Sequence, residues 1–143
     1  MENKKVFVIV YRFSGGALEI LILKPNPEPG RNTDYYVITG GIEKGETSEQ
    51  AALREASEEI GITPIRLIDL NHTIRYQDHI TTKKYTEHCF AAEVDDSKII
   101  LNEEHIGYKW VSPEDFVRTI WWEDGNRAEL SNMIGIIKIH NSR

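Results

Sequence analysis

Apolar residues alternate with polar ones over much of the chain, a pattern typical of a sheet-rich domain. Residues 6–12 and 17–23 are rich in β-branched and aromatic side chains, and Ser14, Gly15 and Gly16 between them predict a hairpin turn. Similar short runs predict further strands at residues 35–38, 66–70, 73–76, 85–94 and 107–111. Loops are expected over residues 25–34 and 77–84.

Three segments have the sequence signals of helices. Residues 48–60 follow Thr47, whose hydroxyl suits a helix N-cap, and Gln50 three positions later completes a capping box. Gly61 suits the C-terminal end of this helix. Two more helices are expected over residues 112–120 and 127–140. Together these elements predict one α+β domain over residues 1–143, with a mixed β-sheet, a central helix and C-terminal helices.

Composition and charge narrow the classes of function. The chain has 143 residues, 40% of them hydrophobic, and a formal net charge of −6. An acidic chain lacks the basic face that a nucleic-acid polymer requires, but it can bind a small phosphorylated substrate because a metal ion inverts the local field. No apolar run is long enough to cross a membrane, and the single cysteine, Cys89, is expected in the core, so we expect a cytoplasmic protein. The oligomeric state, monomer or homodimer, stays open.

The strongest chemical signal is a cluster of glutamates. At about 100° per residue, Glu55, Glu58 and Glu59 fall within an arc of about 100° on the predicted helix, and Glu46 approaches from the preceding loop. Carboxylates this close resist joint ionisation, and a divalent cation relieves their repulsion. Mg²⁺, or alternatively Mn²⁺, suits a site of carboxylates. Taken alone, several glutamates on one helix more often form a solvated surface.

The spacing of these residues resembles the Nudix box, G-x5-E-x7-R-E-U-x-E-E-x-G-U, in which U is a bulky aliphatic residue. The chain matches this pattern at Gly40, Glu46, Arg54, Glu55, Ala56, Glu58, Glu59, Gly61 and Ile62. Ala56 is smaller than the residue usual at its position, but it keeps the helix and its apolar stripe. The resemblance implies a Nudix-type α/β/α sandwich and Mg²⁺-dependent hydrolysis of a nucleoside diphosphate linked to another group, X.

The same resemblance implies roles for individual residues. Glu58 and Glu59 would be the main metal ligands, and Glu55 would share in coordination or act as the base. The backbone carbonyl of Thr39 would add a ligand, and Arg54 would orient the glutamates rather than contact the substrate. The identity of the base differs between members of the family and stays open here.

Segments outside the box bear on the substrate. Residues 36–43 and 86–90 are similar to Nudix enzymes that act on nucleoside triphosphates and dihydroneopterin triphosphate. Residues 104–111 and 121–130 are similar to that group and also to diadenosine tetraphosphate hydrolases. We therefore predict a pyrophosphohydrolase of a nucleoside triphosphate-like small molecule, a dNTP or dihydroneopterin triphosphate. The alternatives are a dinucleoside polyphosphate hydrolase and a non-catalytic module that binds a nucleotide.

Candidate substrate contacts also come from outside the box. Tyr76 and Trp122 offer flat faces for a base, and Lys83 and Lys84 offer cations for phosphates. Core packing and solvated surface charge are the alternative interpretations of these residues. Glu104 is predicted to act as a base or as a further metal ligand. Weaker candidates of the same kinds are Arg12, Lys24, Arg75, Tyr85, Trp110, Trp121, Glu103, His88 and His105.

Overall fold

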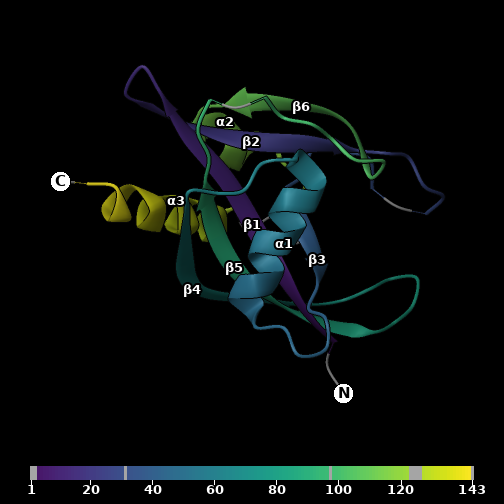
Figure 1. Ribbon diagram of the computed structural model, residues 1–143. Helices are drawn as coiled ribbons and strands as arrows, with labels where there is room; N and C mark the ends of the chain where they lie inside the picture. Colours follow the sequence, from purple (N-terminus) through teal and green to yellow (C-terminus); the bar gives the residue numbers. More distant parts are fainter. Residues whose placement is uncertain (1–2, 31, 97, 123–126, 143) are drawn as a thin grey trace.

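The computed structural model describes residues 3–30, 32–96, 98–122 and 127–142, and its elements follow the predicted order (Figure 1). The strands are β1 (Asn3–Ser14), β2 (Ala17–Pro25), β3 (Ile38–Gly41), β4 (Arg66–Gln77), β5 (Lys84–Glu93) and β6 (His105–Val111). The helices are α1 (Ser48–Ile60), α2 (Pro113–Thr119) and α3 (Ala128–His140).

One mixed sheet contains all of these strands. Its strand order is β4-β5-β1-β2-β6, with β3 paired to β1 beside this path. β1 runs parallel to β5 and antiparallel to β2 and β3. The predicted turn at Gly15 and Gly16 joins β1 to β2, and both glycines have positive φ angles, 57° and 82°. Because β1 lies in the middle of the sheet, its residues from Val6 to Tyr11 are buried on both faces.

Helices cover both faces of this sheet. Ala51, Ala52, Ala56 and Ile60 of α1 pack on one face, against a cluster that includes Val8. On the other face, α2, its C-cap residue Ile120 and α3 contribute to a second cluster that includes Phe116, Ile120, Leu130, Met133 and Ile137. Figure 1 shows α1 lying across the front of the sheet. The predicted α/β/α sandwich is therefore confirmed, and the small side chain of Ala56 fits this close contact between helix and sheet.

The capping signals of α1 are confirmed. The Thr47 side chain accepts a hydrogen bond from the Gln50 backbone N–H, and the Gln50 side chain accepts one from the Thr47 N–H. At the other end, Gly61 has a φ of 70° and donates its N–H to the Ser57 carbonyl. Helical spacing places Leu53 with Ala56 and Ile60 on the predicted apolar stripe, but Leu53 is 36% exposed, so the stripe is narrower than expected. These caps fix where the helix begins, and so where its glutamates lie.

Two strand predictions differ from the structure. The strand expected at residues 35–38 begins later, at Ile38, because β3 pairs with β1 from Lys5 to Val8 through Gly40 and Gly41. The strands expected at residues 66–70 and 73–76 form the single strand β4, whose register against β5 shifts between Asp69 and Thr73. Cys89 is fully buried, as predicted. Within the described residues, no helix has the length and apolar character needed to cross a membrane.

Candidate active site

The backbone of β3 passes directly beside a glutamate of α1. A Cβ atom on Gly40 would lie 2.0 Å from Glu55 Cδ, which is far inside contact distance. A Cβ atom on Gly41 would meet nothing within 4 Å. The glycine at position 40 is therefore needed for the close approach of the Glu55 carboxylate to β3, the strand that also carries Thr39.

Arg54 joins the glutamates into one network. Its Nε and Nη2 donate to both carboxylate oxygens of Glu46, at 2.7 and 3.0 Å. Nη1 donates to Glu55 Oε1 at 2.8 Å and to Glu58 Oε2 at 3.4 Å, and Nη2 also donates to the Gly41 carbonyl at 2.8 Å. Hydrogen bonding between the two side chains raises the pKa of Arg54 and lowers the pKa of Glu46. One guanidinium can thus orient three carboxylates at once.

Glu59 lies deepest in this network. Its residue is 2% exposed, and its Oε2 atom has no hydrogen-bond partner among the described residues. Its Oε1 atom lies 3.6 Å from His105 Nδ1. Burial raises the pKa of Glu59, and a hydrogen bond with Glu55 and the negative charge of Glu104 act in the same direction. A buried carboxylate with an unpaired oxygen is costly unless a cation neutralises it.

These features fit a divalent cation. The donor set consists of carboxylate oxygens, which Mg²⁺ and Mn²⁺ prefer, and the orphaned Oε2 of Glu59 could supply one ligand. As the side chains stand, the described residues contain no group of three or more His, Cys, Asp or Glu placed to hold an ion. Glu58 accounts for part of this result, because its side chain is 53% exposed and turned toward Arg54. An exposed side chain can rotate toward Glu55 and Glu59 at little cost.

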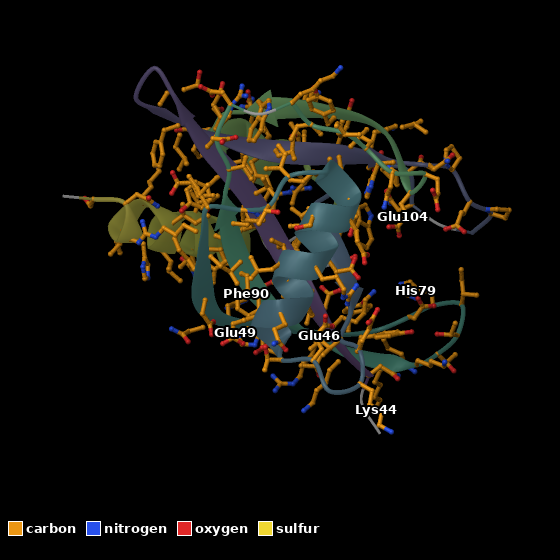
Figure 2. The ribbon with its side chains drawn as sticks, viewed as in Figure 1. Lys44, Glu46, Glu49, His79, Phe90 and Glu104 are labelled. Carbon is orange, nitrogen blue, oxygen red and sulfur yellow. The ribbon has the colours of Figure 1, made fainter. Side chains whose placement is uncertain are left out.

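A cavity of about 1300 Å³ opens beside this network. We call one part of its lining the helix end, formed by Thr39, Glu59 and Glu104, and another part the sheet end, formed by Lys5, Tyr76, Glu87 and Trp122. Figure 2 shows Glu104 and His79 on two separate loops on the same side of α1, and both residues line the cavity. The Glu104 loop is fixed by Asn26, whose N–H donates to the Glu104 carbonyl at 2.8 Å.

Several predicted substrate contacts line this cavity, and others do not. Tyr76, Trp122 and Glu104 do, and so do Arg75, Tyr85, Trp121, Glu103 and His105. Lys83 and Lys84 are exposed and are not part of the lining. Lys84 has the opposite parity along β5 from Tyr85 and Glu87, so its side chain points to the other face of the sheet. Among the described residues, the lysine and arginine in the cavity lining are Lys5 and Arg75. Arg75 has the opposite parity along β4 from Tyr76, so of these two residues it is Lys5 that shares the face of Glu87.

The remaining candidates have structural contacts elsewhere. The Arg12 guanidinium lies 4.1 Å from the Trp110 ring centroid, and Lys24 lies over the Tyr35 ring. His88 shares a hydrogen bond with Asp69 at 2.8 Å and lies on the face of the sheet opposite Glu87. Residues 123–126, part of the segment that is similar to diadenosine tetraphosphate hydrolases, lie outside the described residues.

Sequence reasoning missed Glu87 and Lys5. Glu87 is 3% exposed and lines the cavity, and Tyr76 Oη donates to its Oε2 at 3.1 Å. Lys5 is its register partner on β1. A signal was present, because Glu87 has the same parity along β5 as Cys89 and Ala91, which are fully buried. A charged residue at a position whose periodicity predicts burial is a candidate functional residue, because charged side chains are rarely buried without a partner.

Comparison with known proteins identifies the family. A model of the NUDIX domain matches residues 1–131, so the chain belongs to the Nudix family. The chain is 27% identical to dihydroneopterin triphosphate diphosphatase of Escherichia coli (strain K12), over 89% of this chain and 91% of the relative. It is 29% identical to the asymmetrical bis(5'-nucleosyl)-tetraphosphatase of Caenorhabditis elegans, over 82% of this chain and 85% of the relative.

The fold is also similar to solved structures. A C. elegans Ap4A hydrolase in a binary complex superimposes with a TM-score of 0.72 at 24% identity, covering 94% of this chain and 97% of that one. The predictions of the Nudix fold and of a hydrolase are thus confirmed, and the protein is a Nudix hydrolase. Members of this family generally use divalent metal cations, which agrees with the carboxylate site described above.

Proposed function

We propose that the protein is a Mg²⁺-dependent pyrophosphohydrolase of a nucleoside triphosphate-like substrate, a dNTP or dihydroneopterin triphosphate. The observation that carries the proposal is the buried Oε2 of Glu59, which lacks a partner within the described part of the chain, at the helix end of a large cavity. The E. coli relative named dihydroneopterin triphosphate diphosphatase matches 89% of this chain, which supports this choice of substrate class.

Four residues would hold the cation. Glu55, Glu58 and Glu59 would supply carboxylate oxygens, and Thr39 would supply its backbone carbonyl. When bound, a divalent cation neutralises phosphate oxygens and lowers the pKa of water. Arg54 would keep Glu55 oriented through their hydrogen bond, and its two bonds to Glu46 hold the guanidinium in place. Glu58 would turn from Arg54 toward the cation. Mn²⁺ would fit the same oxygen ligands.

Glu104 is the residue we assign as the base. Its loop lies at the cavity and is held by Asn102, whose Oδ1 accepts from the Glu104 N–H at 3.0 Å. As the oxygen of water bonds to phosphorus, the P–O bond of the anhydride breaks and the leaving phosphate takes its electron pair. Glu104 takes the proton of the water. For a nucleoside triphosphate, the products are the nucleoside monophosphate and pyrophosphate.

A dinucleoside tetraphosphate is the second candidate substrate. The cavity volume of about 1300 Å³ is larger than the roughly 300–1,000 Å³ typical of small-molecule sites, so it has room for a longer polyphosphate or a second nucleoside. The C. elegans relative named bis(5'-nucleosyl)-tetraphosphatase supports this candidate. The two substrate classes differ in their products and are separated by the experiment below.

The test is an assay of the purified protein with Mg²⁺ on dNTPs, dihydroneopterin triphosphate, diadenosine tetraphosphate, ADP-ribose and NADH, with the products identified by chromatography. We expect Glu58→Gln and Glu59→Gln to lower kcat by roughly a hundredfold or more, because each removes a charged metal ligand. Glu49→Gln is the matched control, since Glu49 lies on α1 on the side away from Glu46 and Glu104 (Figure 2). Turnover of none of these compounds, or full activity of Glu59→Gln, would contradict the proposal.

A further inference from the structure

The sheet end of the cavity contains a buried carboxylate that the proposed reaction does not use. Glu87 lies in the middle of the sheet, where its register partners are Lys5 on β1 and Ile74 on β4. Farther along β5, Cys89 and Ala91 on the same face pack into the core beneath α2 and α3. Glu87 therefore stands where the core ends and the cavity begins. An apolar residue would extend the core there at lower cost than a carboxylate.

The neighbours of Glu87 keep it ready to accept hydrogen bonds. Tyr76 Oη donates to Glu87 Oε2 at 3.1 Å, and the ammonium group of Lys5 favours the ionised carboxylate. Burial raises the pKa of Glu87 to about 7, against the effects of Lys5 and Tyr76. A carboxylate has about four acceptor positions, and Tyr76 takes one of them. A ligand that meets this group must therefore present hydrogen-bond donors.

A second polar atom at the sheet end lacks a partner. The indole nitrogen of Trp122, Nε1, is buried and has no hydrogen-bond partner in the described part of the chain. The Trp122 ring lies edge-on to Phe7, with centroids 6.0 Å apart, and Phe7 is two residues from Lys5 on β1. An indole N–H only donates, so its partner in a ligand must be an acceptor such as a carbonyl oxygen. A ligand that fits the sheet end is therefore a flat ring that carries hydrogen-bond donors for Glu87 and an acceptor for Trp122 Nε1.

We propose that Glu87 is a specificity-determining residue that selects substrates with a 2-amino-4-oxo ring edge, the edge that guanine and pterins share. This inference rests on the proposed function, because it concerns the ring of the same phosphorylated substrate. The adjacent ring N–H and amino group donate in parallel to the two Glu87 oxygens, as an arginine fork does. The neighbouring ring carbonyl accepts from Trp122 Nε1.

Other bases fit this arrangement poorly. Adenine and cytosine place a ring-nitrogen acceptor beside their amino group, and this acceptor would face a Glu87 oxygen. Thymine and uracil present one N–H between two carbonyls, so an oxygen would face the carboxylate. An acceptor against a buried carboxylate leaves both groups unpaired, and such mismatches cost more than the matched contact gains.

The first measurement is kcat/KM with Mg²⁺ for dGTP and dihydroneopterin triphosphate against dATP, dCTP and dTTP. We expect a preference of at least about tenfold for the first two, because a two-point contact distinguishes bases by this much or more. Glu87→Gln replaces one acceptor by an amino donor, so the preference should fall to about twofold or less while the rates for the poor substrates change little. Tyr76→Phe removes one donor and keeps the ring, so it should leave an intermediate preference.

Glu93→Gln is a matched control for Glu87→Gln. Glu93 has the same parity on β5 and also accepts a hydrogen bond from a tyrosine, Tyr11, at 3.5 Å, but it does not line the cavity. We expect it to keep the wild-type preference. Thermal unfolding followed by circular dichroism verifies that each variant is folded, and the ratio between substrates does not depend on the active fraction. Equal preferences in Glu87→Gln and Glu93→Gln would overturn the inference.

The second measurement separates this inference from the proposed function. It is the binding of guanosine, neopterin and adenosine, without phosphates and without metal, observed by NMR titration. We expect guanosine and neopterin to bind at least about tenfold more tightly than adenosine, and Glu87→Gln to remove the difference. This result without hydrolysis of any phosphorylated substrate would support the inference and contradict the proposed function. Hydrolysis without preference between the bases would support the function and overturn the inference.

Discussion

The two ends of the cavity each contain a glutamate that is almost fully buried, Glu59 at the helix end and Glu87 at the sheet end, with 2% and 3% exposure. Burial raises the pKa of both. Carboxylates surround Glu59 and add to the rise, whereas Lys5 and Tyr76 beside Glu87 limit the rise to a pKa of about 7. Burial alone therefore does not define the role of a carboxylate. In our proposals, the negative neighbours of Glu59 call for a cation, and the free acceptor positions of Glu87 call for an uncharged ring that donates hydrogen bonds.

The largest effect is expected from Gly40→Ala at the helix end. The added methyl group would lie 2.0 Å from Glu55 Cδ and would displace this carboxylate from its place beside β3. A displacement of about 1 Å in such a site can lower kcat about a hundredfold, while a flexible side chain moves at little cost in stability. Steady-state kinetics and thermal unfolding measure the two effects. Gly41→Ala should have nearly the kcat and Tm of wild type. Equal losses of kcat in Gly40→Ala and Gly41→Ala would show that displacement of Glu55 is not the cause.

A smaller loss is expected from Arg54→Lys. A lysine cannot make the paired bonds to Glu46 together with the bonds to Glu55 and the Gly41 carbonyl. Partners that orient metal ligands are typically worth about 10- to 100-fold in metal affinity or activity. We expect kcat to fall by about this factor, with the Mg²⁺ concentration for half-maximal activity raised and KM for the substrate little changed. A change confined to KM would instead indicate that Arg54 contacts the substrate.

The sheet end predicts a pH dependence of stability. Between pH 4.5 and about 7 the folded state keeps a proton on Glu87 that the unfolded chain has lost, because the pKa of Glu87 is raised from 4.5 to about 7. Its contribution to stability is therefore complete below pH 4.5 and is lost as the pH rises through 7. The shift corresponds to about 3 kcal/mol. Urea unfolding at pH 5 and at pH 8 measures this effect. From pH 5 to pH 8 the free energy of unfolding should fall more in wild type than in Glu87→Gln. Equal falls in the two proteins would contradict this account.

The smallest effect is expected from Mg²⁺ on thermal unfolding. A cation that binds only the folded protein, present at a concentration of about 100 times its Kd, adds about 2.7 kcal/mol to the free energy of unfolding. We expect Mg²⁺ to raise Tm in wild type and in Glu87→Gln, but not in Glu59→Gln. Without Mg²⁺, Glu59→Gln should be at least as stable as wild type, because a buried carboxylate among negative neighbours is removed. A Tm rise of the same size in Glu59→Gln would place the cation elsewhere.

The helix that carries the box glutamates could be predicted from sequence alone. Its boundaries depend on Thr47, Gln50 and Gly61, whose hydrogen bonds join residues within one helical turn. The spacing from Gly40 to Ile62 is likewise a property of the amino-acid sequence, so the resemblance to the family can be recognised before the fold is known. The capping hydrogen bonds and the relative positions of the glutamates are the same in any fold that contains this helix.

The lining of the cavity could not be predicted in the same way. Lys83 and Lys84 are the main predicted cations, but neither is in the cavity lining, whereas Lys5, which was not a candidate, is. The sequence does not show that β1 pairs in parallel with β5, which brings Lys5 beside Glu87 across 82 positions of the chain. The start of β3 at Ile38, rather than at residue 35, depends in the same way on its pairing with β1. Pairing between distant strands follows from the packing of the whole sheet.

The sequence by itself determined the glutamates and arginine of the box and, through them, the family, because these depend on short-range spacing along one helix and its flanking turns. The α/β/α architecture followed from the resemblance to that family. Only the tertiary structure decided that Glu59 is buried with an oxygen that no described residue pairs, that Gly40 makes room for Glu55, and that Glu87 and Trp122 line one cavity. Burial and the meeting of residues from different strands exist only after the sheet has formed, and burial gives these carboxylates their chemistry.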